Sequence, residues 1–278
     1  MHQLLGTIVQ PPVNFKASSF QNVFSIAQIV VFAVMVAFAL RELARGKGPI
    51  FISCLIGGAI AVIWEPIVDV LGQCWLPSRG QHWEAFTLIG RHIPLMMPFV
   101  YSWFVGGQGY LFYRIFDRGI DRRRLFQLYG LVMLVNVALE SPGVLTNVYT
   151  YYGKQPMDIW GLPLWWVIIN PLMPMIAGAA IYKLKPLLTT PQLIVAVIAI
   201  IPCADGAANA IVGWPVIAAL NTNVGYAGTW VASFITLGLG LSVAWLMSLL
   251  VARPSVAVAT APATVPAVQP SMPIAAGV

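Results

Sequence analysis

The chain is short of charged residues, and this shortage excludes most soluble proteins. Lysine, arginine, aspartate and glutamate make up 9% of its 278 residues, whereas soluble domains carry about 25%. Hydrophobic residues make up 59%, and the mean hydropathy is +0.82. Most of the surface must therefore face lipid tails, which excludes a cytosolic enzyme, a DNA-binding domain and a disordered tail protein.

Cysteine and histidine are also scarce, and neither forms a metal-binding pattern. They stand singly, without CxxC, HxxxH or HExxH spacing, at Cys54, Cys74, Cys203, His2, His82 and His92. This spacing argues against a disulfide framework, a zinc or diiron site and haem ligation by paired helices. We therefore expect no metal and no other cofactor.

Long apolar stretches dominate the chain. Seven of them approach the 20 or so residues that a bilayer-spanning helix needs: 22–40, 50–71, 93–116, 125–140, 162–182, 192–212 and 228–251. The sequence thus predicts an all-α, polytopic transmembrane helix bundle of about seven spans over residues 22–251. Residues 1–21 form an N-terminal tail without a cleavable signal peptide. The Ala/Pro/Val-rich tail over 252–278 lacks periodicity and is predicted to be disordered.

The basic residues predict the orientation of these spans. Eleven lysines and arginines lie on one side of the predicted bundle, including those of the run DRGIDRRR at 117–124, and four lie on the other side. The positive-inside rule then places the N-terminus outside and the C-terminus in the cytoplasm, and we expect a bacterial plasma membrane. Loop topology also accounts for the net charge of +6, so no nucleic-acid partner is expected.

Four carboxyl groups fall at a similar depth in the predicted outer half of the bilayer. Glu65 and Asp69 come late in the second span, Glu140 ends the fourth, and Asp205 lies past the middle of the sixth. Ionisable groups at membrane depth are costly, so these four are the candidate catalytic residues. A structural alternative remains open, in which Glu65 and Asp69 pair with Arg79 or Arg91.

Aromatic and amide side chains gather on the same predicted side. The long loop Ser141–Pro163 follows Glu140 directly, and its tyrosines suggest a lid over a cavity. Candidate substrate contacts are Trp64, Tyr149, Tyr151, Tyr152, Trp165, Trp166, Asn170 and Asn209. The alternatives are a belt of interfacial aromatics and amides that hold helices together. The GGQG motif at 106–109 favours close helix packing rather than phosphate binding.

These residue types suit acid–base chemistry on a lipophilic molecule. A carboxyl group removed from water favours its protonated form and can donate a proton, while a second one that stays ionised acts as base or stabilises a cation. Aromatic faces stabilise a developing carbocation or oxocarbenium ion, and a water-poor cavity protects it from hydration. Acid-initiated cyclisation or dehydration needs no cofactor.

Four segments of the chain resemble a known family. They are WEPIVDVLGQCWLP from Trp64, RHIPLMMPFVYSWFVGGQGYLFYRIFDRG from Arg91, LESPGVLTNVYTYYGKQP from Leu139 and GLPLWWVIINPLMP from Gly161. Together they are similar to the AveC family of actinobacterial membrane proteins, named after the avermectin spirocyclase. The resemblance covers about residues 50–190 and implies spiroketal formation: a dihydroxy ketone or its hemiketal loses water through an oxocarbenium ion, which a second hydroxyl captures.

We therefore expect a membrane-embedded cyclase or dehydratase of polyketide-type secondary metabolism, with Asp205 or Glu140 as proton donor and the Glu65/Asp69 pair as base and cation stabiliser. Its partners would be the lipid bilayer and a lipophilic small molecule, and the sequence does not indicate an oligomeric state. Two other functions remain open. One is a membrane terpenoid or carotenoid cyclase or hydratase, and the other is a proton-coupled lipid transporter, although the chain lacks the inverted repeat common in such transporters.

Overall fold

The structure is a computed structural model that describes residues 9–81 and 83–252. The predicted tail beyond Ala252 and two histidines, His2 and His82, lie outside the described residues. The α-helices are α1 (Phe20–Ala44), α2 (Ile50–Ala61), α3 (Glu65–Gly72), α4 (Met96–Tyr101), α5 (Gln108–Arg118), α6 (Arg122–Leu145), α7 (Leu164–Ile169), α8 (Leu172–Leu184), α9 (Thr190–Ala207), α10 (Trp214–Leu220) and α11 (Gly225–Val251).

Several shorter elements interrupt or join these helices. Two are 3₁₀-helices, η1 (Val62–Trp64) and η3 (Lys185–Leu187), and two are π-helices, η2 (Ser102–Gly107) and η4 (Ala208–Val212). The strands are β1 (Cys74–Trp75), β2 (Glu84–Leu88), β3 (Arg91–Pro94), β4 (Thr150–Tyr151), β5 (Asp158–Ile159) and β6 (Leu162–Pro163). They form three antiparallel pairs, β1 with β4, β2 with β3 and β5 with β6.

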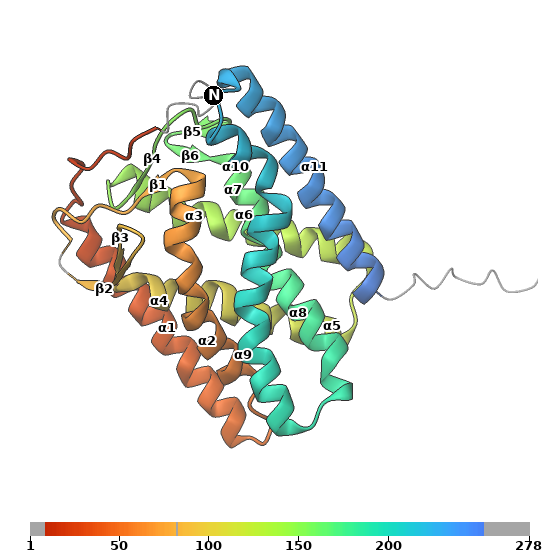
Figure 1. The fold of residues 1–278 in the computed structure, drawn as a ribbon. Coiled ribbons are helices and arrows are strands. Elements are labelled where there is room, and N and C mark those ends of the chain that lie inside the picture. Colours follow the sequence, from red (N-terminus) through yellow and green to blue (C-terminus); the bar gives the residue numbers. More distant parts are fainter. Residues whose placement is uncertain (1–8, 82, 253–278) are drawn as a thin grey trace, which may run out of the picture.

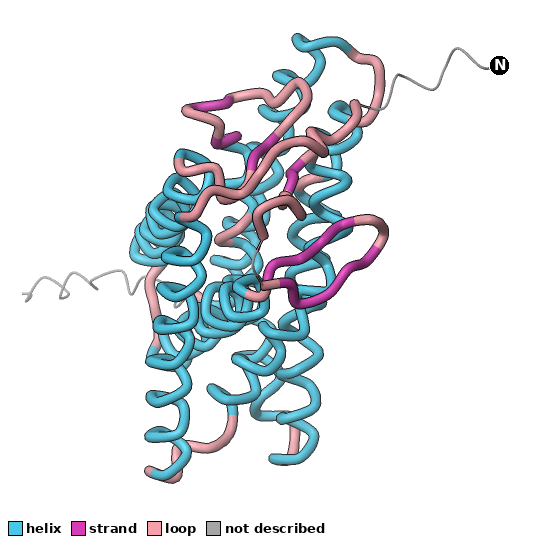
Figure 2. The backbone as a smooth tube through the Cα atoms, turned by 90° about the vertical axis from the view of Figure 1, so that its left-hand side faces the viewer, coloured by secondary structure: helices cyan, strands magenta, loops and turns pink. Residues whose placement is uncertain are grey.

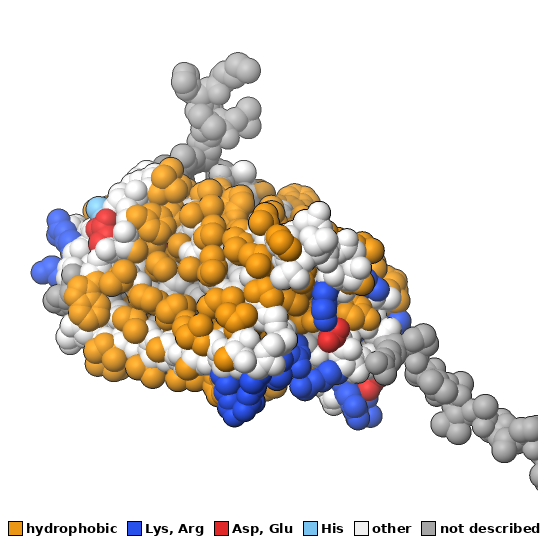
Figure 3. Space-filling model, turned by 90° about the horizontal axis from the view of Figure 1, so that it is seen from below, with side chains coloured by type: hydrophobic (Ala, Val, Ile, Leu, Met, Phe, Trp, Pro, Cys, Tyr) orange, Lys and Arg blue, Asp and Glu red, His pale blue; other side chains and the backbone are white. Residues whose placement is uncertain are grey.

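The predicted all-α transmembrane bundle is confirmed. Six helical segments of the described chain are long and apolar enough to cross a membrane: Phe20–Ala44, Ile50–Gly72, Arg122–Leu145, Leu164–Leu187, Thr190–Val212 and Gly225–Val251. These segments correspond to six of the seven stretches identified in the sequence, and the short fourth stretch proves to be a helix of 24 residues. Exposed apolar side chains cover most of the face shown in Figure 3.

The remaining predicted span, 93–116, has a different position. It forms the continuous succession α4, η2 and α5, which is not among the six segments. Residues 101–110 are buried without exception, so the middle of this segment packs inside the bundle, whereas Leu111 beyond it is exposed. A buried helix tolerates the polar and glycine residues that a lipid-facing helix excludes. The count of seven spans and the orientation of the termini stay predictions.

The buried segment organises the core. Figure 1 shows α4, η2 and α5 running across α9, with α6 crossing in the same sense at another level. Helix α2 packs on η2 and α9, and α5 packs on α8. The contact between α2 and η2 is very close, because a Cβ atom on Gly106 would lie 2.2 Å from the carbonyl oxygen of Cys54. Close packing at the GGQG motif is thereby confirmed.

Figure 2 shows most of the strands and longer loops toward one end of the bundle, whereas one two-stranded hairpin lies part way along its side. The pairing of β1 with β4 sets Cys74 opposite Tyr151, which brings the loop after α6 to the end of α3. Helix α3 stops at Gln73, whose left-handed backbone (φ 55°) turns the chain into β1. Residues distant in the sequence thus meet around the end of α3.

Candidate active site

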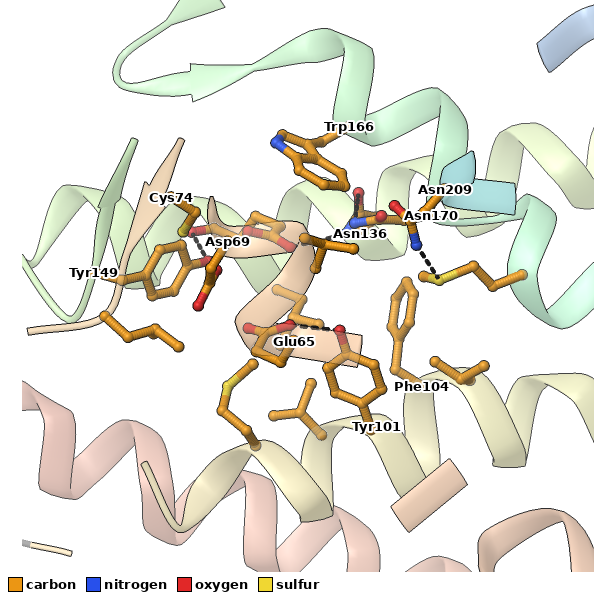
Figure 4. A pocket seen from close by; sticks show the side chains of 18 of the residues that line it. Glu65, Asp69, Cys74, Tyr101, Phe104, Asn136, Tyr149, Trp166, Asn170 and Asn209 are labelled. Atoms are coloured by element: carbon orange, nitrogen blue, oxygen red, sulfur yellow. Dashed lines mark hydrogen bonds between the residues drawn. The ribbon is translucent and has the colours of Figure 1, made fainter. Parts of the chain in front are cut away.

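A pocket between α3, α4, η2, α6 and the loop after α6 contains most of the candidate residues (Figure 4). About 90 Å³ of it is open to the centre of a water molecule. We call it the carboxyl pocket. Its polar lining consists of Glu65, Asp69, Cys74, Tyr101, Asn136, Glu140, Tyr149, Tyr151, Asn170 and Asn209.

Glu65 begins helix α3 and is held by a phenol. Pro66 follows it at the first turn, where its missing N–H leaves no helical hydrogen bond unmade. The Tyr101 hydroxyl donates to Glu65 Oε2 at 2.5 Å, and the glutamate is only 8% exposed. The hydroxyl of Tyr101 thus holds the Glu65 carboxyl group in place without adding a compensating positive charge.

Glu140 near the end of α6 receives three hydrogen bonds from neutral side chains. The Tyr149 hydroxyl donates to Glu140 Oε2 at 2.6 Å, Tyr151 donates to the same atom at 3.2 Å, and Asn136 Nδ2 donates to Oε1 at 3.4 Å. Burial, and then the negative charge of Glu140, raise the pKa of Tyr149 and of Tyr151 well above the usual value for tyrosine. Both phenols therefore stay protonated and remain donors at neutral pH.

Asp69 lies one helical turn after Glu65, on the same face of α3, and is 2% exposed. The Cys74 thiol donates to it, and burial together with the charge of Asp69 raises the pKa of that thiol well above its usual range. The other carboxyl oxygen of Asp69, Oδ2, is buried and has no hydrogen-bond partner among the described residues.

The structural alternative of an ion pair with Arg79 or Arg91 does not hold in the described residues. Neither Glu65 nor Asp69 takes part in an ion pair there. The guanidinium of Arg91 lies over the ring of Trp75, 4.8 Å from its centre, and donates to the Tyr152 hydroxyl at 2.9 Å. It attracts Asp69 only through space.

Asp205 stands behind the pocket wall rather than in it. It is fully buried, and its Oδ1 accepts a hydrogen bond from Asn209 Nδ2 at 2.9 Å, while its Oδ2 has no partner within the described chain. Asn209 occupies the wall position, because η4 places it one turn beyond Asp205. The expectation that Asp205 contacts the cavity directly therefore requires correction.

Three amides form one side of the pocket, as Figure 4 shows. Asn170 Nδ2 donates to Asn136 Oδ1 at 3.2 Å, so these two link α6 to the segment between α7 and α8. Asn209 Nδ2 also approaches the Met173 sulfur at 3.7 Å, whereas its Oδ1 is buried without a partner in the described residues. That oxygen is an acceptor available to a hydroxyl group of a ligand.

The predicted aromatic contacts divide into two groups. Tyr149, Tyr151 and Trp166 line the pocket. Trp64, Tyr152 and Trp165 do not: Trp64 Nε1 donates to the Pro202 carbonyl, Tyr152 accepts from Arg91, and Trp165 is fully buried and stacks on Trp166. These three side chains support the wall from outside.

Sequence reasoning missed Tyr101, Cys74 and Phe104, all of which line the pocket. The first and third lie in the predicted span 93–116, where they were indistinguishable from lipid-facing aromatics. The burial of that span inside the bundle is what turns them toward the cavity. Cys74 is buried, and its contact with Asp69 depends on the turn at Gln73.

No group of three or more His, Cys, Asp and Glu side chains in the described residues is arranged to hold a metal ion. The donors that face the pocket carboxyl groups are phenols, amides and a thiol, which is an arrangement for proton chemistry. Comparison with family models, with curated proteins and with solved structures finds no match to this chain.

Proposed function

We propose that the protein is a membrane-embedded cyclase that converts a lipophilic dihydroxy ketone, or its hemiketal, into a spiroketal by cofactor-free acid–base catalysis. One observation carries the proposal: three carboxyl groups from two helices line one buried pocket, held by neutral donors and without an ion pair in the described residues. The resemblance of four segments to the AveC family supports the same chemistry.

The carboxyl groups divide into an acid and a base. Carboxylates that share a water-poor site repel one another, so one of them keeps its proton most readily when another is ionised. Three donors directed at Glu140 suit an ionised group, which only accepts hydrogen bonds. The unpartnered Oδ2 of Asp69 suits a protonated group that is available to a substrate oxygen.

In the proposed reaction, Asp69 donates a proton to the hydroxyl of the hemiketal, the C–O bond breaks, and water leaves. The resulting oxocarbenium ion is stabilised by the negative charge of Glu140 and by the face of Trp166. The second hydroxyl of the substrate attacks the cationic carbon and forms the new C–O bond. Glu140 accepts the proton released, and a proton then returns from Glu140 to Asp69, so that over a full turnover the net change is the loss of one water molecule.

Glu65 and Asp205 assist the acid–base pair of Asp69 and Glu140 in this proposal. Glu65, fixed by Tyr101, adds a second negative charge beside the cation. Asp205 orients Asn209, whose free oxygen accepts a hydrogen bond from a hydroxyl of the substrate. Asp205 is thus a positioning residue in this proposal, and its loss has a smaller effect than the loss of Glu140 or Asp69.

Metabolite profiling of the native host tests the proposal. Deletion of the gene should cause an uncyclised hydroxyketone to accumulate, and the wild-type gene should restore the cyclised product. Glu140→Gln and Asp69→Asn should fold and yet fail to restore it, since each leaves shape but removes a proton-transfer group. Asp205→Asn should restore part of the product, about tenfold less than wild type, because it weakens one hydrogen bond that acts through Asn209.

The matched control is Asp117→Asn, which makes the same chemical change at an exposed aspartate that pairs with Lys185 outside the pocket. It should restore the product fully. Full restoration by both pocket variants, or an unchanged profile in the deletion strain, would contradict the proposal. Accumulation of an isoprenoid precursor instead would indicate a terpenoid cyclase and would contradict the proposed substrate class.

A further inference from the structure

A second cavity lies at the other end of helix α1. Phe24 of α1 lines the carboxyl pocket, and Glu42 of the same helix lines the second cavity. At 1.5 Å per residue these two positions are about 27 Å apart along the helix. The cavity is bounded by α1, the start of α2, η2 and α5, and about 310 Å³ in it is open to the centre of a water molecule. We call it the arginine pocket; its walls include Phe38, Glu42, Gln108, Leu111, Arg114 and Arg118.

The arginine pocket carries a surplus of positive charge. Glu42 is its one acidic lining residue, and it is already engaged: Lys47 pairs with it at 3.1 Å, Arg114 lies at 3.6 Å, and the Tyr110 hydroxyl donates to it. Arg118 forms no ion pair within the described residues and is exposed at the pocket. An anion is therefore the ligand that the charge of this pocket favours.

Two buried polar atoms in its wall lack partners in the described chain. They are Oε1 of Gln108, a residue only 8% exposed, and Nε of Arg114. Burying such atoms unpaired is costly, and each is satisfied by a ligand that offers the complementary group. Arg114 requires an acceptor such as a phosphate oxygen, whereas Gln108 Oε1 requires a donor such as a hydroxyl.

The rim of the arginine pocket is apolar and faces outward. Phe38 is 51% exposed and Leu111 is 46% exposed, although both line a pocket with two arginines. Phe38 continues a row of exposed apolar side chains on α1 that includes Val30 and Val34, the surface that lipid tails cover in a membrane-spanning helix. An apolar rim does not stabilise the binding of a free anion. It does stabilise an anion attached to acyl chains, because the chains bury apolar surface against it.

The geometry points to a binding site for the head group of an anionic glycerophospholipid in the arginine pocket. The phosphate is held by Arg114 and Arg118, a head-group hydroxyl donates to Gln108 Oε1, and the acyl chains lie along Phe38 and Leu111. A phosphoglycerol head group supplies both the negative phosphate and the hydroxyl donors. Figure 3 shows many of the lysine and arginine side chains at the lower right of the molecule and others at its left edge, with a broad hydrophobic surface between them. The site serves neither acid nor base in the cyclisation, and it stands without that proposal.

Native mass spectrometry of the full-length protein tests the inference. The protein is released from detergent micelles that contain phosphatidylglycerol, phosphatidylcholine or glycerol 3-phosphate. Wild type should retain one phosphatidylglycerol in preference to phosphatidylcholine. Arg118→Gln should lower that retention about tenfold, since a hydrogen bond to a charged group is lost, and Gln108→Met should lower it by a smaller factor.

The matched control removes more positive charge than Arg118→Gln does, but outside the pocket. The double variant Arg122→Gln/Arg123→Gln changes two exposed arginines at the start of α6, and it should retain the lipid as wild type does. An equal loss in this control would show general surface attraction and would overturn the inference. So would unchanged retention in Arg118→Gln, or binding of glycerol 3-phosphate as tight as that of the whole lipid, which would indicate a free-phosphate site.

Discussion

The two pockets differ in how they hold their acidic side chains. In the arginine pocket, Glu42 is surrounded by a lysine, an arginine and a tyrosine, so its charge is neutralised in place. In the carboxyl pocket, Glu65 and Glu140 receive hydrogen bonds from tyrosines and an asparagine, and no cation pairs with them in the described residues. An ion pair fixes the charge state of a carboxyl group, whereas neutral donors orient it and leave it free to exchange a proton.

The two pockets share one element. The π-helix η2 contributes Phe104 and Val105 to the carboxyl pocket and Gly107 to the arginine pocket. π-Helical turns are rare and occur often at functional sites, because the extra residue changes which side chains face a cavity. The chemistry of the two pockets is separate, but both depend on how η2 packs against α2.

The largest loss of stability is expected from Gly106→Ala, because this substitution should distort both pockets at once. The new Cβ atom would lie 2.2 Å from the Cys54 carbonyl oxygen, which belongs to rigid helical backbone, so α2 and η2 must separate. Overpacking of this kind lowers the free energy of unfolding by about 3 kcal/mol. Thermal unfolding in detergent measures it, with product formation and lipid retention expected to fall together.

Gly130→Ala is the control for that variant. Gly130 lies in α6 and has no atom within 4 Å of the position of a new Cβ. The substitution should be neutral or raise the free energy of unfolding by up to about 1 kcal/mol, because alanine favours a helix more than glycine does. An equal loss of stability in both variants would show that the close contact at Gly106 is not the cause.

The sequence was sufficient to predict the class of the fold and to identify three acidic residues that line one pocket. Apolar runs about 20 residues long predicted six of the membrane-length helices, because length and hydropathy alone decide that property. Glu65, Asp69 and Glu140 do line one pocket, since side chains at similar positions on neighbouring spans come together. Their catalytic role stays a prediction.

What the sequence did not indicate depends on which side of a helix is buried. Residues 101–110 lie inside the bundle, so Tyr101 and Phe104 face a cavity, and hydropathy cannot distinguish this from contact with lipid. Asn209, rather than Asp205, lines the pocket, and the sequence alone does not indicate which of the two reaches it. The free oxygens of Asp69 and Asn209 likewise emerge only from the packed side chains.

The next largest effect is expected when the neutral hydrogen-bond donors of the carboxyl pocket are removed. The double variant Tyr149→Phe/Tyr151→Phe keeps the aromatic rings but deprives Glu140 Oε2 of both phenols. Each hydrogen bond to a charged group contributes about 1.5–3 kcal/mol, so each single variant should form product about tenfold more slowly and the double variant more slowly still. Turnover with the accumulated hydroxyketone measures this. Lipid retention at the arginine pocket should not change, and a parallel loss there would show general misfolding.

The same tyrosines predict how stability responds to alkaline pH. Because their pKa is raised in the folded protein, folding favours the protonated phenols. Their contribution to stability is fully present below the unfolded pKa of about 10 and is lost as the pH rises toward the folded pKa. Above pH 10, unfolding measured in detergent should become easier by up to about 1.4 kcal/mol per pH unit for each tyrosine. The slope should be shallower in the double variant, and identical slopes would contradict this origin.

The smallest effect on stability and product formation is expected at Glu84. This acidic residue is exposed at the surface of the protein and serves as a comparison for Glu140 in the carboxyl pocket. Hydrogen bonds from Thr87 and then from His92 lower the pKa of Glu84, and the contact with His92 links β2 to β3. The sign follows from that direction: the stabilisation is present above the usual glutamate pKa of about 4.3 and is lost as the pH falls below it. Because the side chain is exposed and screened, Glu84→Gln should leave thermal unfolding at neutral pH unchanged within error. Product formation should match wild type, whereas a loss as large as that of Glu140→Gln would mean that the hairpin, and not the carboxyl pocket alone, carries the activity.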